Sequence, residues 1–261
     1  MNQGSGFFIM RPFNGLFLAC MAFFVLVLVL GSLWLRKKPD PVRRRVLAAV
    51  CVLTLIGFFI YKYQLSIDAE YDRAYAVMGG FSWWSELPLH VCNINMILIP
   101  IAVLTDSRPL MSFSFFIGPL GALMALVMPG LGFSGYSIFL PRMLGYYGTH
   151  FMIIIEALAI VTLGLYRPKF RDLPKTILTF FLIAVVIFGI DVLMRSTGLN
   201  PKANYFYLME TEGNGLLEIF HRWIPLPFLY MLPCIAILAV YMVAVTAGFA
   251  LTGRKGETAE A

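Results

Sequence analysis

Long apolar stretches alternate along the chain with short polar connections. Each stretch holds about 20 residues, and at a rise of about 1.5 Å per residue it can cross a hydrocarbon core of about 30 Å as a helix. A β-barrel would instead show short segments of alternating polarity. We therefore expect an all-α, polytopic membrane protein: a seven-transmembrane-helix bundle formed by a single transmembrane domain, residues 1–261. The expected spans are residues 13–35, 45–63, 87–105, 110–128, 148–166, 174–196 and 223–250.

Composition supports the membrane class. Hydrophobic residues make up 60% of the chain and charged residues 13%, whereas soluble chains carry roughly 25% charged residues. The net charge of +6 lies in the connections between the spans, which argues against a nucleic-acid partner. The cysteines show neither a disulfide framework nor metal-ligand spacing, so we expect no metal and no organic cofactor. They all fall inside apolar spans, at Cys20, Cys51, Cys92 and Cys234.

Basic residues gather in alternate connections. They crowd residues 36–45 and 167–175, and Arg108 lies in the basic connection between these two. Lys and Arg mark the cytoplasmic side of a membrane protein, and acidic residues dominate the opposite connections. We therefore expect the C-terminus in the cytoplasm, the N-terminus outside, and a multi-pass protein of the plasma membrane.

Several polar side chains fall inside the predicted spans, and all of them lie in the outer half. An intramembrane charge costs at least about 2.5–3.5 kcal/mol. Polar residues at the same depth in three different spans are therefore not expected by chance. A polar cavity in the outer half would supply one. The side chains are His90, Cys92, Asn93 and Asn95 in the third span, His150 and Glu156 in the fifth, and Asp191 in the sixth.

Cys92 and His150 form the pair best suited to chemistry. A thiol becomes a good nucleophile when a base takes its proton, and a histidine from another span can act as that base. We expect the sulfur and the ring within about 3–5 Å of each other. Asn95, one helical turn after Cys92, or a backbone N–H can steady an oxyanion. Asp191 or Asn204 can orient His150, and the sequence does not choose between them.

Plainer interpretations stay open for the same residues. A cysteine in an apolar helix is commonly a small buried hydrophobe. A histidine near a membrane surface commonly makes an interfacial hydrogen bond, and Asn95 can simply bridge two helices. Glu156 and Asp191 can pair with Arg142, with Arg195 or with the backbone.

Three short motifs resemble one known family. They are LPLHVCNI at Leu87–Ile94, GTHF around His150, and NYFYL at Asn204–Leu208. In this order they resemble the bacterial YwaF-like integral membrane family, which is similar to a eukaryotic transmembrane acyltransferase family acting on ether phospholipids. The resemblance implies Cys92 as nucleophile and His150 as catalytic histidine. It also implies His90 and Asn204 as further site residues.

The sequence thus predicts a lipid acyltransferase or lipid ester hydrolase with a Cys nucleophile and a His base in an outer-half cavity. The substrate would be a phospholipid or another acyl lipid, and acyl-CoA stays open as a donor. Two alternatives come from other classes: a transporter or permease component that binds a solute in the same cavity, and a non-catalytic membrane subunit. Against the transporter, the sequence shows no inverted repeat and no polar route through the inner halves. The oligomeric state is not indicated.

Overall fold

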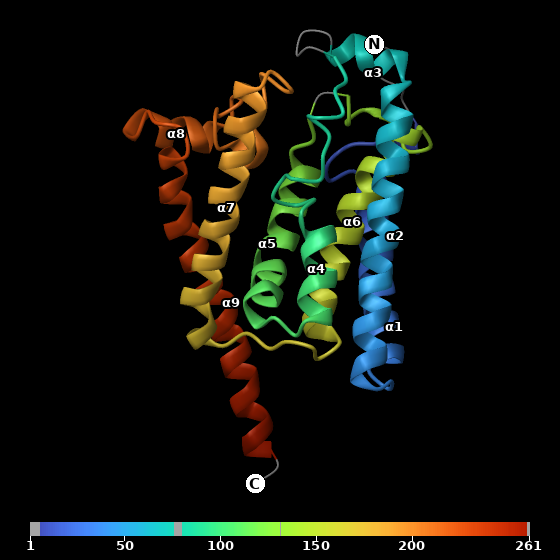
Figure 1. Ribbon diagram of the computed structural model, residues 1–261. Helices are drawn as coiled ribbons and strands as arrows, with labels where there is room; N and C mark the ends of the chain where they lie inside the picture. The colour runs from blue at the N-terminus through green and yellow to red at the C-terminus, as the bar shows by residue number, and fades with distance from the viewer. Residues whose placement is uncertain (1–5, 76–79, 131, 260–261) are drawn as a thin grey trace. The chain divides into compact units, whose positions relative to one another are not determined.

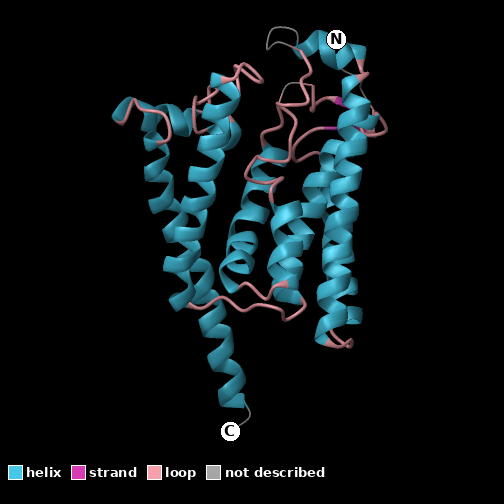
Figure 2. Cartoon of the chain, in the orientation of Figure 1, coloured by secondary structure: helices cyan, strands magenta, loops and turns pink. Residues whose placement is uncertain are grey.

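A computed structural model describes residues 6–75, 80–130 and 132–259 of the chain. This described part is mostly helical and contains very little strand (Figures 1 and 2). Its α-helices are α1 (Gly15–Leu35), α2 (Asp40–Ser66), α3 (Ala69–Tyr75), α4 (Asn95–Leu104), α5 (Arg108–Val127), α6 (Pro141–Thr162), α7 (Leu173–Ser196), α8 (Gly215–Trp223) and α9 (Leu232–Ala259). Three 3-10 turns accompany them: η2 (Phe170–Asp172), η3 (Tyr205–Tyr207) and η4 (Leu229–Met231). Strands β1 (Ile9–Met10) and β2 (Tyr136–Ser137) pair antiparallel.

The exposed apolar side chains of the long helices indicate that lipid surrounds them. Within the described residues, 6 helices are long and apolar enough to cross a membrane. In α1, only 6% of the most apolar window is buried, and Phe23, Leu26 and Leu30 are exposed. Contiguous apolar surface on this scale is not stable in water. The chain is therefore a multi-pass membrane protein.

The third predicted span is wrong at its start. Residues 82–94 form turns, and helix α4 covers only the 10 residues Asn95–Leu104. At about 1.5 Å per residue this is about half the membrane thickness. The side chain of Asn95 explains the break: its Nδ2 donates to the carbonyl of Val91 at 2.9 Å, which a continuous helix would pair with a backbone N–H. Seven full-length helices are therefore not observed in the described part.

Two other predicted boundaries also need correction. The fifth span, expected from residue 148, begins at Pro141 because proline at the first helical position has its φ set for a helix. The last span, expected from residue 223, begins with η4 at Leu229 and continues as α9. Residues 224–228 stay irregular, since Pro225 and Pro227 cannot donate helical hydrogen bonds.

Contacts divide the chain into two compact units. The first unit comprises Met1–Ser107 and Ser114–Leu165, and the second comprises Arg108–Phe113 and Tyr166–Ala261. The single domain expected from the sequence stays a prediction.

Glycines bring the helices of the first unit close together. In this unit α2 packs against α4 and α6, and α1 packs against α6. Gly145 of α6 faces the ring of Tyr61 so closely that a Cβ atom would overlap it. A Cβ at Gly121 of α5 would lie 2.8 Å from Cγ1 of Val91 and 3.4 Å from the backbone nitrogen of Cys92. The turn that carries Cys92 is therefore held against bare backbone of α5, as small residues allow in membrane helices.

Arginines of the first connection cap two helix ends. Nη1 of Arg44 donates to the carbonyl of Val103 at 2.8 Å, near the end of α4. The guanidinium of Arg43 donates to the carbonyl of Leu163, and that of Arg36 to the carbonyl of Thr162, at the end of α6. A cation at a helix C-terminus satisfies free carbonyls and opposes the negative end of the helix dipole. Part of the basic cluster in residues 36–45 is thus structural.

Replacing Arg44 should destabilise the protein measurably. Arg44 also pairs with Asp40 at 2.6 Å and with Asp106 at 2.8 Å. We expect Arg44→Met to lower the free energy of unfolding by about 1.5–3 kcal/mol, the range for hydrogen bonds that involve a charged group. Thermal unfolding in detergent measures the change. Arg45→Met, an exposed neighbour on the same helix, is the control; equal melting temperatures for both variants would refute the capping role.

The second unit joins the start of α5 to α7 through polar contacts. The hydroxyls of Ser112 and Thr176 lie 2.5 Å apart, and the Tyr166 hydroxyl donates to Ser112 Oγ at 2.9 Å. Arg108 pairs with Asp172 at 2.8 Å. Between α7 and α9 the chain forms a loop, residues 197–214, followed by the short amphipathic helix α8.

Candidate active site

Cys92 sits in the turn that immediately precedes α4. Its side chain is buried, with 7% exposed. The thiol lies 3.6 Å from Oδ1 of Asn93. A sulfur at the start of a helix faces unpaired N–H groups and the positive end of the helix dipole, which favours a negative charge there.

His150 reaches Cys92 from α6. Its Nε2 lies 3.6 Å from Sγ of Cys92, so the structure brings the two residues together as expected. Its Nδ1 lies 2.7 Å from the backbone carbonyl of Tyr146, one turn earlier on the same helix. A carbonyl can only accept, so Nδ1 carries the hydrogen and Nε2 is left with a lone pair toward the thiol.

The partner of His150 was mispredicted. Asp191 and Asn204 were the candidates for orienting the ring, but the backbone carbonyl of Tyr146 orients it. The Tyr146 ring also packs on the imidazole, with centroids 4.5 Å apart. Every helix offers a carbonyl four residues back, so no residue type in the sequence marks this partner.

The pair is poised for proton transfer in a dry environment. His150 is 6% exposed and Cys92 is 7% exposed. Burial disfavours a separated thiolate and imidazolium, because each charge loses its hydration. The resting pair is therefore best described as a neutral thiol beside a neutral imidazole.

Asn95 braces the turn that carries Cys92. Its Nδ2 donates to the carbonyl of Val91 at 2.9 Å and to that of Cys92 at 3.3 Å, and the residue is fully buried. Because both amide hydrogens are engaged, the backbone N–H groups of Cys92 and Asn93 are better placed to donate to an oxyanion. Within the described residues, Oδ1 of Asn95 has no hydrogen-bond partner.

His90 lies in the same turn segment, next to an ion pair that the sequence reading missed. Lys62 of α2 pairs with Glu86, which belongs to segment 82–94 together with His90. The sequence did indicate a partner for Lys62, because a lysine inside the apolar span 45–63 is energetically costly unless it is paired.

Glu156 is not part of the Cys92–His150 pair. It follows His150 by six residues, about 9 Å along α6, and is 1% exposed. Thr54 Oγ1 donates to its Oε1 at 2.5 Å, so Glu156 faces α2. Arg142, its possible partner from the sequence, instead pairs with Asp68 at 2.7 Å.

Asp191 and Asn204 belong to the second unit. Asp191 is fully buried in α7, and its Oδ1 accepts from the backbone N–H of Tyr205 at 3.0 Å. Arg195, its possible partner from the sequence, pairs with Glu210 at 2.9 Å. One cavity shared by these residues and Cys92 stays a prediction.

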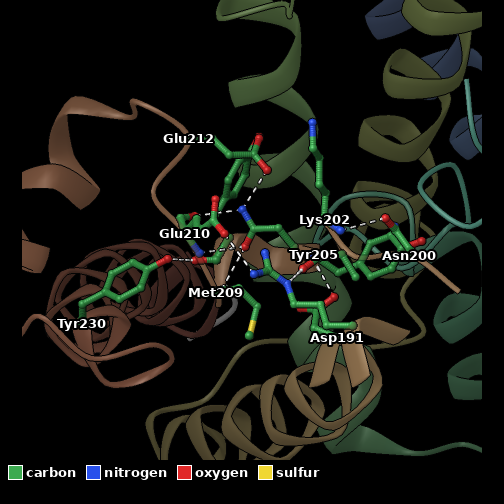
Figure 3. Close-up of polar contacts among 12 residues, drawn as sticks. Asp191, Asn200, Lys202, Tyr205, Met209, Glu210, Glu212 and Tyr230 are labelled. Atoms are coloured by element: carbon green, nitrogen blue, oxygen red, sulfur yellow. Dashed lines mark hydrogen bonds and ion pairs between the residues drawn. The ribbon is translucent and has the colours of Figure 1, made fainter. Parts of the chain in front are cut away.

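Asn204 organises the loop that follows it. Its Oδ1 accepts from the backbone N–H groups of Met209 at 2.9 Å and Glu210 at 3.0 Å. Its Nδ2 donates to Oε1 of Glu212 at 2.7 Å (Figure 3). Burial raises the pKa of the Glu212 carboxyl, although the hydrogen bond from Asn204 opposes this. These contacts support a loop-building role for Asn204, and its role in a site stays a prediction.

The same loop contains strained backbone. Phe206, Tyr207 and Glu212 have φ values of 59°, 57° and 47°, in the left-handed region that side chains disfavour. The Tyr230 hydroxyl donates to the carbonyl of Tyr207 and helps to hold this conformation (Figure 3). The NYFYL motif therefore encodes a specific loop shape. Within the described residues, no group of three or more His, Cys, Asp or Glu is arranged to hold a metal ion.

The long helices are apolar and of spanning length, and a Cys–His pair is buried among helices of the first unit. These features define a polytopic helical membrane protein that contains a buried candidate nucleophile. The model of the TMEM164 family matches residues 10–246, and the chain belongs to this family of transmembrane proteins. No match was found among curated proteins or among solved structures. The YwaF-like resemblance and the chemistry it implies stay predictions.

Proposed function

We propose that the chain is a membrane-embedded lipid acyltransferase or lipid ester hydrolase. Cys92 is the nucleophile and His150 the base, and the substrate is a phospholipid or another acyl lipid. The observation that carries this is the 3.6 Å approach of Nε2 to Sγ, with Nδ1 bonded to the Tyr146 carbonyl. Nucleophile, base and an orienting group in line are the recurrent signature of covalent acyl transfer.

The chemistry follows from this arrangement. Nε2 of His150 takes the thiol proton as the sulfur attacks the acyl carbonyl, and backbone N–H groups of Cys92 and Asn93 donate to the oxyanion. The tetrahedral intermediate collapses, the C–O bond of the ester breaks, and Nε2–H returns its proton to the leaving alcohol. A thioester remains on Cys92. An acceptor hydroxyl, or water in hydrolysis, then gives its proton to Nε2 and attacks the thioester, which regenerates the thiol.

Trapping the thioester tests the proposal. Purified protein would be incubated with mixed phospholipids and quenched in acid, and the peptide that contains Cys92 would be weighed by mass spectrometry. An acyl adduct on Cys92 that is absent from Cys92→Ser supports the proposal. Lipid profiles of cells carrying the wild type and Cys92→Ser then identify the donor and acceptor. Identical profiles and no adduct would remove the enzyme hypothesis.

We also propose the full topology: seven crossings in the plasma membrane, with segment 82–94 and α4 together making the third. The N-terminus is outside and the C-terminus cytoplasmic, which puts Cys92 in the outer half. This follows from the distribution of Lys and Arg. A cysteine introduced at Lys38 should resist an impermeant maleimide applied to intact cells, and one at Lys202 should react. Labelling at position 38 from outside would reverse the orientation.

One observation favours the transporter alternative. Helix α4 has only 10 residues and directly follows a turn segment that carries His90 and Asn93. Short, discontinuous helices bind solutes in secondary transporters. Solute flux into proteoliposomes that survives Cys92→Ala would support that function. Loss of lipid chemistry in the same variant, without flux, would support the enzyme.

A further inference from the structure

Three large apolar side chains of α8 are exposed although this helix packs against the second unit. Helix α8 has 9 residues, with the sequence GLLEIFHRW. Leu216, Ile219 and Trp223 are 48%, 47% and 69% exposed. They follow one another at spacings of three and four residues, so they lie on one side of the helix and form what we call the α8 stripe. A contiguous exposed apolar surface of this kind marks an interaction surface.

The α8 stripe adjoins the side of the helix that the protein already covers. Leu217 and Phe220 are buried in a cluster with Tyr230. Because each residue turns a helix by about 100°, these two buried positions and the α8 stripe form one continuous apolar arc. The polar positions fall on the opposite side of the helix; they are Glu218, His221 and Arg222. Helix α8 therefore has three sides: one on the protein, one apolar and exposed, and one polar.

Helix α8 is fixed to the end of a membrane-spanning helix. It packs against η4, η4 packs against α9, and the candidate span Leu229–Thr252 begins with η4. The chain changes direction between α8 and η4, where Pro225 and Pro227 lie and Phe228 has a φ of 65°. Figure 1 shows α8 lying across the end of α9 and not in line with it. The helix thus lies at the level where α9 enters the membrane.

The helix that holds α8 is itself surrounded by lipid. Only 17% of the most apolar window of the span Leu229–Thr252 is buried, and Leu229 and Leu232 at its start are each 39% exposed. Tryptophan is enriched at the membrane interface, where one end of the ring system meets apolar chains and the other meets water. A helix with one apolar side, one polar side and a tryptophan commonly lies in the plane of that interface. Lipid is therefore the occupant that fits both the α8 stripe and the surface next to it.

We propose that α8 is an interfacial helix, which inserts Leu216, Ile219 and Trp223 into the leaflet from which α9 enters the membrane. The α8 stripe contacts lipid at the boundary between headgroups and acyl chains, and the polar side faces water. Oδ1 of Asn214 accepts from the backbone N–H groups of Leu216 and Leu217 at 3.1 and 3.3 Å, which lowers the cost of placing this helix end near lipid. The proposed contact is independent of the chemistry at Cys92 and of the side of the membrane on which α8 lies.

The fluorescence of Trp223 reports its surroundings directly. Changing Trp34, Trp83 and Trp84 to phenylalanine leaves Trp223 as the only tryptophan, and the full chain is reconstituted in vesicles of phosphatidylcholine brominated on its acyl chains. An interfacial helix buries its apolar side by about 5–10 Å. We therefore expect Trp223 to lose most of its emission with bromine near the glycerol and less with bromine at the methyl end of the chains. Iodide in the water should quench it only weakly.

A matched variant moves the tryptophan to the polar side. Arg222→Trp combined with Trp223→Phe turns the only tryptophan by about 100° round the helix. This protein should show the reverse pattern, with strong quenching by iodide and weak quenching by bromine. A protein that keeps only Trp34 is the reference for lipid contact, because Trp34 is 60% exposed near the end of α1.

A second measurement keeps the native tryptophans and so does not depend on the folding of the phenylalanine variants. Spin labels on cysteines introduced at Ile219 and at Arg222 are compared after subtraction of the spectrum without the introduced cysteine. The label at 219 should favour oxygen, which concentrates in lipid, and the label at 222 a water-soluble nickel complex. Equal preferences at the two positions, or a Trp223 that iodide quenches as strongly as the tryptophan of Arg222→Trp, would overturn the proposal and place α8 in water. A Trp223 shielded from both quenchers would also overturn it and would indicate a second copy of the chain as the occupant.

Discussion

Cys92→Ser is expected to lower lipid acyl turnover by about 10³-fold or more while the protein stays folded. Serine is nearly isosteric, so packing around position 92 changes little. A hydroxyl, however, is a far weaker acid than a thiol, so His150 activates a serine much less effectively than it activates a cysteine. Losses on this scale follow the removal of a nucleophile in well-studied acyl-transfer enzymes. Turnover of radiolabelled phospholipid in nanodiscs gives the rate, and thermal unfolding checks the fold.

His150→Gln should cause a loss of similar size, and the double variant should be little worse than either single variant. Residues that act as one unit show this non-additivity, because the second change removes an interaction already lost. Cys51→Ser is the matched control, since Cys51 is another buried cysteine of the first unit. Two outcomes would show that Cys92 and His150 contribute to packing and not to catalysis. One is a turnover of Cys51→Ser as low as that of Cys92→Ser. The other is a double variant whose loss of activation free energy equals the sum of the two single losses.

Spanning helices were predictable because membrane insertion imposes a simple, local rule. A run of about 20 apolar residues must be a helix in hydrocarbon, since no water can pair its backbone. The third span shows where this rule fails. Segment 87–94 is apolar enough to be counted, yet the Asn95 side chain takes the Val91 carbonyl and replaces the helical bond. Irregular backbone at such a place is tolerated only when protein surrounds it, and this condition belongs to the tertiary fold.

The candidate pair could be found from depth and chemistry, but its supporting groups could not. Cys92 and His150 stand out as a thiol and an imidazole at one depth in two spans. The Tyr146 carbonyl is backbone and carries no sequence signal. Lys62 carries a sequence signal, because a lysine inside the apolar span 45–63 needs a partner, but the sequence does not show that this partner is Glu86. Asn204 was found through a motif, and the structure shows it building a loop.

Arg142→Met is expected to be the most destabilising change outside the candidate site. Arg142 is 3% exposed in the first turn of α6, and it pairs with Asp68 at 2.7 Å and Glu70 at 2.9 Å. These acidic residues follow the end of α2, so the cluster ties α2 to α6, the helices that carry Lys62 and His150. Breaking a buried ion pair costs about 3–5 kcal/mol. We expect about 2–3 kcal/mol here, because the carboxylates of Asp68 and Glu70 are 26% and 45% exposed.

The pH dependence of stability distinguishes this ion pair from simple packing of the Arg142 side chain. Burial tends to raise the pKa of Asp68, but hydrogen bonds from the Tyr71 backbone and from Arg142 outweigh it and lower the pKa. A carboxyl whose pKa is lowered by folding stabilises the protein above its unfolded pKa and loses that contribution as the pH falls through the folded value. Wild-type stability should therefore fall between about pH 5 and pH 2, and Arg142→Met should flatten that fall. Chemical denaturation at several pH values measures both slopes.

Arg108→Met, which breaks a more exposed ion pair with Asp172, should cost less than about 1 kcal/mol. Adding Asp68→Asn to Arg142→Met should recover part of the loss, because it removes a carboxylate left without its cation; a double variant less stable than Arg142→Met would mean that the arginine acts through packing alone.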